Sequence, residues 1–101
     1  MKYRHTFTPV AFQEYSDAVN WYLERSSIAA EHFVMEVNER IYAICEDPFR
    51  YRNQYKNFHE TSLKKFPFYV IYFADEKKKL VVIASVYHHK RSVKQKYKKK
   101  I

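Results

Sequence analysis

Two apolar runs separated by a charged break dominate the second half of the chain. The first run, residues 66–73, is almost entirely aromatic or β-branched, which is typical of a strand that is packed on both faces. The second run covers residues 80–86, and five consecutive charged residues at 75–79 separate the two. Because unpaired charges are costly inside a sheet, the break predicts an exposed turn, and the whole stretch predicts a central β-hairpin.

The second run alternates between two sets of side chains, which a strand presents on opposite faces. Pro67, near the start of the first run, cannot donate a ladder hydrogen bond and therefore marks the beginning of that strand or a bulge. One set of the second run contains Val81, Ile83, Ser85 and Tyr87. We predict that the other set faces the core, namely Leu80, Val82, Ala84 and Val86.

The first half of the chain begins with a short strand pattern and then becomes helical. Residues 3–7 alternate and predict a strand that joins the hairpin at its edge. Thr8 followed by Pro9 predicts a helix start, since a threonine side chain caps a helix and proline fits its first turn. This helix should run to about Glu24. Its predicted apolar stripe is Ala11, Phe12, Tyr15, Ala18, Val19, Tyr22 and Leu23.

A second helix follows almost directly. Ser26 and Ser27 provide the break and the cap, and Pro48 ends the helix because the residue before a proline disfavours helical geometry. The short connection predicts an antiparallel helix hairpin. The apolar stripe of the second helix is Ala30, Phe33, Val34, Val37, Ile41 and Ile44.

Residues 49–58 have no apolar periodicity and predict a surface loop anchored by Tyr51 or Phe49. Residues 59–65 predict another strand, with Leu63 directed inward. The order of elements is then β-α-α-β-β-β. We therefore predict an α+β fold in which the helix hairpin packs on one face of a four-stranded, mainly antiparallel sheet and leaves the opposite face for contact.

Size and composition narrow the class of protein further. A chain of 101 residues is expected to form a single domain over residues 1–101, with a basic tail from about residue 90. The single cysteine, Cys45, excludes an intramolecular disulfide and fits a small core residue better than a catalytic one. No apolar run reaches the length of a signal peptide or a membrane span, so we expect a cytoplasmic protein. The lack of glycine argues against a phosphate-binding loop, and no cofactor or metal is predicted.

Charge is divided unevenly along the chain. Residues 1–50 carry five Lys/Arg and eight Asp/Glu, net −3, whereas residues 51–101 carry fourteen Lys/Arg and three Asp/Glu, net +11, which together give the net charge of +8. This asymmetry indicates that one surface meets an anion, either a nucleic acid or an acidic protein. The alternative is a charged surface that only aids solubility.

The end of the last predicted strand holds the strongest candidates for chemistry. His88 and His89 are adjacent, so on a strand they point to opposite faces and do not share one metal ion. Lys90 and Arg91 follow, which makes this end a candidate anion site. The alternative is that one histidine packs and the other is solvated.

For RNA cleavage, a histidine of this cluster would move a proton while Arg91 and Lys64 or Lys65 stabilise charge on the phosphate. The aromatic and basic residues at 49–58 also admit base stacking, although sealing of the core is the more common role of such aromatic residues.

Four segments in order resemble the RelE/ParE superfamily of bacterial toxins from type II toxin-antitoxin modules, and they look closest to its ParE-like branch. They are TPVAFQEYSDAVNWYLERSSIAAEHFVMEV at 8–37, DPFRYR at 47–52, KKFPFYVIYF at 64–73 and ASVYHHKR at 84–91. The resemblance covers nearly the whole chain. It implies a plasmid-stabilisation or growth-inhibition function and neutralisation by an antitoxin encoded next to the toxin.

By this resemblance, RelE-like members cleave mRNA on the ribosome, whereas ParE-like members inhibit DNA gyrase without cutting RNA. The position of a phosphate-contacting arginine in the nuclease branch is Tyr69 here. The basic residues of the preceding strand are only partly matched by Lys64 and Lys65. His88 matches a histidine that acts in some nuclease relatives, and Arg91 matches their terminal arginine.

We therefore expect a toxin that binds and inhibits DNA gyrase. The alternatives are a ribosome-dependent mRNA endoribonuclease with His88, Arg91 and Lys65 as catalytic residues, and a degenerate, non-toxic family member. The expected partner is an acidic, amphipathic antitoxin segment, in a homodimer or a toxin-antitoxin hetero-oligomer. The predicted partner- or target-binding residues are Lys64, Tyr87, His89, Lys90, Lys94 and Lys96.

Overall fold

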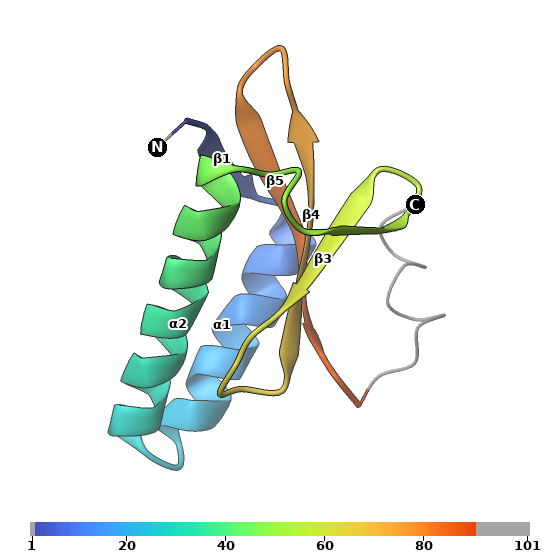
Figure 1. The fold of residues 1–101 in the computed structure, drawn as a ribbon. Helices are drawn as coiled ribbons and strands as arrows, with labels where there is room; N and C mark the ends of the chain where they lie inside the picture. Colours follow the sequence, from blue (N-terminus) through green and yellow to red (C-terminus); the bar gives the residue numbers. More distant parts are fainter. Residues whose placement is uncertain (1, 91–101) are drawn as a thin grey trace.

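Two helices pack on one face of an open five-stranded sheet in the computed structural model, of which residues 2–90 are described (Figure 1). The sheet has the order β1-β5-β4-β3-β2, with β1 parallel to β5 and every other pair antiparallel. The elements are β1 (Arg4–Phe7), α1 (Pro9–Leu23), α2 (Ser27–Glu46), β2 (Arg52–Tyr55), β3 (Phe58–Ser62), β4 (Phe68–Asp75) and β5 (Leu80–His88). The predicted α+β class and helix hairpin are confirmed.

The sheet has one strand more than predicted. β2 lies inside the segment predicted to be a loop, and all four of its residues are exposed at the edge of the sheet. A strand without a buried face has no alternating apolar pattern, so its sequence gave no signal. The next strand, β3, ends three residues earlier than predicted, while Leu63 is buried as expected.

The helix boundaries follow the predicted capping residues. The Thr8 hydroxyl accepts a hydrogen bond from the backbone N–H of Ala11 at 3.1 Å, and Pro9 is the first residue of α1. The Ser26 hydroxyl accepts from the N–H of Ala29 at 3.2 Å and so caps α2. α2 ends one residue before the Asp47–Pro48 pair, where the chain leaves helical geometry.

The core between helices and sheet is centred on α2. Five of the six residues of its predicted stripe are buried, and Val34 is half-buried. On α1 the predicted stripe is partly wrong: Ala11 and Ala18 are buried, whereas Phe12 is 59% exposed and Leu23 is also exposed. Small alanine side chains let α1 approach the sheet closely, and Phe12 packs edge to face on Phe7 of β1 instead.

The face prediction for β5 is wrong for most of the strand. Val81 and Ile83 are fully buried in the helix-side core, together with Val86. Ala84 and Tyr87 belong to a second apolar cluster with Phe58 and Ile71, and Leu80 and Val82 are half-buried. The cause is a register shift opposite Ile71 and Tyr72, where β5 has one extra residue and its alternation changes phase.

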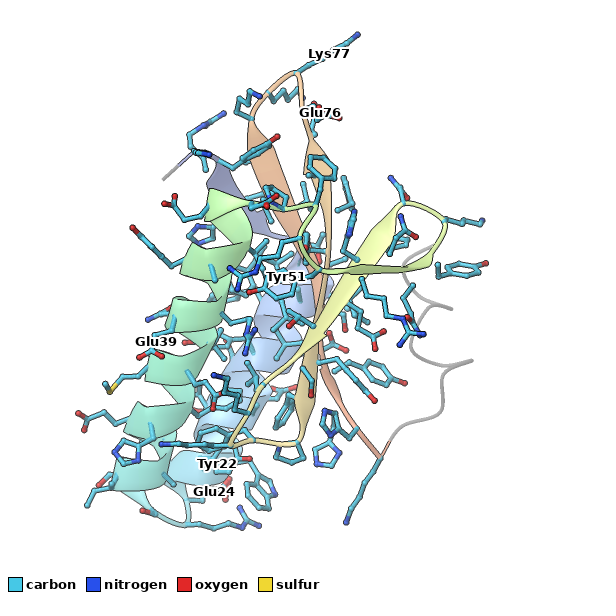
Figure 2. All side chains as sticks on the ribbon, viewed as in Figure 1. Tyr22, Glu24, Glu39, Tyr51, Glu76 and Lys77 are labelled. Carbon is cyan, nitrogen blue, oxygen red and sulfur yellow. The ribbon has the colours of Figure 1, made fainter. Side chains whose placement is uncertain are left out.

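The segment after α2 is anchored by Tyr51, one of the two residues predicted for this role. Tyr51 is half-buried and its carbonyl oxygen lies 2.9 Å from Nδ1 of His59, whereas Phe49 is exposed. Figure 2 shows Tyr51 between α2 and the sheet. The hydroxyl of Tyr72 donates to the carbonyl oxygen of Pro48 at 2.6 Å, which ties the same segment to the central strand.

Candidate functional site

The two adjacent histidines at the end of β5 point to opposite faces of the sheet, as predicted. His88 is half-buried beside α1, and its ring lies 5.1 Å from that of Phe68. His89 is exposed on the opposite face, where its ring lies 4.3 Å from that of Tyr69 and its Nε2 lies 3.0 Å from the Ser62 hydroxyl. The two rings therefore belong to different surfaces.

Tyr69 occupies the position at which the nuclease branch is expected to hold an arginine. Its aromatic ring packs against the exposed His89, and its backbone pairs with Tyr87 on β5 and Ser62 on β3. A phenol supplies no positive charge to a phosphate, whereas an arginine supplies a fixed charge and several donors. At this position the described part of the sheet therefore holds a close, tilted pair of rings, Tyr69 and His89, and the residue at 69 carries no positive charge.

Lys64 and Lys65 lie in the loop between β3 and β4, on the side of α2. The backbone N–H groups of both residues donate to the Glu36 carboxylate, at 3.1 Å for Lys65. This carboxylate fixes the loop against the helix. Lys65 lines a groove along α2, whereas His88 lines another groove along α1, so these two predicted catalytic residues are not gathered around one point. The third, Arg91, lies outside the described residues.

The predicted binding residues are also distributed over different surroundings. Tyr87 is only 2% exposed, in the apolar cluster of the open sheet face, so it is a packing residue and not the exposed contact that we expected. Lys90 is exposed, and its backbone N–H donates to Nδ1 of His88 at 3.0 Å. Lys94 and Lys96 lie outside the described residues.

The groove along α2 has a volume of about 500 Å³ and combines charge with aromatic surface. The guanidinium of Arg40 lies 5.6 Å from the centre of the Tyr51 ring, and that of Arg50 lies 5.5 Å from it. The residues that line the groove from α2 are His32, Met35, Glu36, Glu39, Arg40 and Ala43. Sequence reasoning missed this surface, because its residues come from α2, from Arg50 and Tyr51, and from the loop at 64–66, which only the fold brings together.

The groove along α1 has a volume of about 400 Å³ and lies where β5 extends beyond β1. Glu14 is a structural residue there: its carboxylate accepts from the Ser85 hydroxyl at 2.7 Å and from the Val86 N–H at 3.2 Å. It thereby satisfies a backbone donor that no neighbouring strand reaches. Asp17 and Trp21 also line this groove, together with His88.

Residues 2–90 offer little support for a metal site, a reactive cysteine or a membrane-spanning helix. No group of three or more His, Cys, Asp or Glu side chains that suits a metal ion occurs among them. Cys45 is buried, and this burial raises the pKa of its thiol, which disfavours the reactive thiolate. None of the helices in this part of the chain is long and apolar enough to cross a membrane.

The chain resembles known proteins both in its sequence and in its fold. The model of one protein family, described as the ParE toxin of the type II toxin-antitoxin system parDE, matches residues 6–93. No curated protein sequence matches this chain significantly.

Several solved structures share the fold. The chromosomal ParDE toxin-antitoxin system of P. aeruginosa superposes with a TM-score of 0.72 at 12% identity, covering 86% of this chain and 96% of that one. The isolated E. coli RelE toxin gives a TM-score of 0.61 at 17% identity over 97% and 96% of the two chains. The intact E. coli RelBE complex gives 0.61 at 16% identity over 88% and 99%.

Proposed function

Because the chain belongs to the ParE toxin family of type II toxin-antitoxin systems, we propose that it acts by binding and inhibiting DNA gyrase and that a cognate antitoxin neutralises it. Its cellular location would then be the cytoplasm, as a single domain that ends in a basic tail. The observation that carries the proposal is the placement of Tyr69, which packs on His89 where a nuclease would need a cation.

The first test is a supercoiling assay with purified protein and gyrase. We expect supercoiling to stop at saturating toxin. Unaffected supercoiling at that concentration would count against gyrase as the target.

The second candidate is a ribosome-dependent mRNA endoribonuclease that uses His88, Arg91 and Lys65. The observation in its favour is that His88 lines a groove and is oriented by the backbone N–H of Lys90, which suits a proton-transfer residue. In this case His88→Ala and Arg91→Ala would each abolish growth arrest. Full growth inhibition by both variants would exclude the nuclease mechanism.

For the antitoxin, we propose an acidic, amphipathic segment that covers cations such as Lys64 and Lys90 and packs on exposed apolar side chains. Charge complementarity supports this partner, since residues 51–101 carry a net charge of +11. Size-exclusion chromatography with the product of the adjacent gene should give one complex. Two separate peaks would contradict the proposed partner, and overexpression of the chain without growth arrest would indicate a non-toxic family member.

A further inference from the structure

Four basic side chains line the groove along α2, and none of them forms an ion pair with a carboxylate of residues 2–90. They are Arg40, Arg50, Lys64 and Lys65. All of them except Arg40, which is half-buried, are exposed. Like charges gathered around a groove favour an anionic ligand, because their fields add there and a bound anion relieves their mutual repulsion.

The two arginines of the groove are held beside one aromatic ring. The guanidinium of Arg40 lies 5.6 Å from the centre of the Tyr51 ring and that of Arg50 lies 5.5 Å from it. Nη1 of Arg40 also donates to the Tyr51 hydroxyl at 3.4 Å. Tyr51 is half-buried, and Figure 2 shows it between α2 and the sheet. An arginine positioned in this way loses less freedom when it binds a carboxylate, with which it forms two parallel hydrogen bonds.

The two lysines of the groove are positioned by Glu36. Their backbone N–H groups donate to its carboxylate, which holds the loop against α2. The Glu36 carboxylate thus already accepts two hydrogen bonds, whereas the ammonium groups of Lys64 and Lys65 have no carboxylate of residues 2–90 paired with them. The groove also offers apolar surface, from the exposed Met35 and the half-buried Phe66. Its chemistry therefore fits a ligand that combines carboxylates with an apolar side chain.

A nucleic acid fits this groove less well than an acidic peptide. Its backbone carries a charge at every nucleotide, and the exposed Glu39 carboxylate, which also lines the groove, would oppose it. Two guanidinium groups already lie over the Tyr51 ring, so a base would have to displace them in order to stack. A peptide is able to place carboxylates opposite the cations alone and to leave Glu39 without a contact.

We propose that the groove along α2 binds a short acidic segment of the antitoxin, whose carboxylates pair with the arginines over Tyr51 and with the lysines of the loop. An apolar side chain of the same segment packs against Met35 and Phe66. This inference rests on the proposed function, because it takes the acidic antitoxin as the partner and assigns the site that binds it. Local contacts in the groove, and not only the overall charge of +8, then determine the affinity. The groove along α1 has no lysine or arginine among its described lining residues and stays outside this site.

Two charge changes of opposite sign test this assignment, with the product of the adjacent gene as the ligand. Isothermal titration calorimetry measures its affinity for the toxin. Arg50→Glu reverses an exposed cation of the groove and should weaken binding about tenfold or more. Glu39→Lys replaces the opposing carboxylate by a cation and should strengthen binding about threefold.

The matched controls lie in the distant turn between β4 and β5, where Glu76 and Lys77 are both exposed (Figure 2). Lys77→Glu and Glu76→Lys make the same changes of net charge and should each alter the affinity less than about twofold. Equal effects of Arg50→Glu and Lys77→Glu would overturn the proposal, because overall charge would then account for the binding.

Two further outcomes would also overturn the proposed site. If single-stranded RNA binds the wild type and Arg50→Glu abolishes that binding while the antitoxin still binds with full affinity, the occupant of the groove is a nucleic acid. Absence of any complex with the product of the adjacent gene would refute the proposed partner together with the site, whereas a complex that Arg50→Glu does not weaken would refute the site alone. A negative supercoiling assay bears on the proposed target and does not alter these binding results.

Discussion

Tyr72 shows how one side chain holds several parts of this small protein together. It is fully buried in the central strand, its ring stacks on that of His59 at 5.3 Å, and its hydroxyl donates to the Pro48 carbonyl oxygen. The sequence predicted an interior strand here but not the hydrogen bond, because the acceptor lies 24 residues away in an irregular segment. Contacts between residues so far apart in the sequence form only in the assembled fold, so a local sequence pattern does not predict them.

We expect Tyr72→Phe to lower the free energy of unfolding by about 1–3 kcal/mol, because the buried Pro48 carbonyl oxygen loses its donor. Urea denaturation measures this change. Tyr42→Phe is the matched control, since it removes the same hydroxyl from an exposed ring and should change stability very little. Equal losses in the two variants would show that the Tyr72 hydroxyl has no special role.

The same residue makes stability depend on alkaline pH. Burial raises the pKa of Tyr72 above its ordinary value of 10.0, so above that pH the unfolded chain loses a proton that the folded chain retains. The contribution of Tyr72 is therefore fully present below pH 10.0 and is lost as the pH rises further towards its folded-state pKa. In denaturation experiments above pH 10, stability should fall less steeply in Tyr72→Phe than in the wild type. Identical slopes would mean that another group causes the loss.

At the scale of elements, prediction from sequence succeeded where the chain carries its own local signal. Both helices begin at hydroxyl caps and α2 ends just before Pro48, because capping and proline geometry act over three or four residues. The β5 faces and the α1 stripe were predicted less well. In β5 the extra residue, Ala84, changes the alternation of faces relative to β4, and in α1 the buried Ala11 and Ala18 let the helix approach the sheet closely. Both features depend on the neighbouring element, so the pattern of apolar and polar residues within one segment does not predict them.

Adjacent serines allow a direct test of the α2 cap. Ser26→Ala should destabilise the protein by about 1 kcal/mol, because the N–H of Ala29 loses its acceptor at the end of the helix. Ser27→Ala changes the next residue, which is already helical, and should be neutral or slightly stabilising. Thermal unfolding of both variants measures the difference. A larger loss for Ser27→Ala would contradict the assignment of Ser26 as the cap.

At the scale of the whole molecule, the fold distributes charge and exposed side chains over separate surfaces. The candidate nuclease residues Lys65 and His88 line different grooves, one along α2 and one along α1. The sequence predicted that the two halves of the chain differ in charge, but the positions of these surfaces required the fold. Several separate contact surfaces suit a protein that binds one macromolecule and is neutralised by another.

The most direct test of this account measures gyrase supercoiling and ribosome-dependent mRNA cleavage with one preparation of the purified protein. We predict that supercoiling stops, that the mRNA stays intact, and that addition of the antitoxin restores supercoiling. Cleaved mRNA together with unchanged supercoiling would contradict the central claim that this toxin acts by binding.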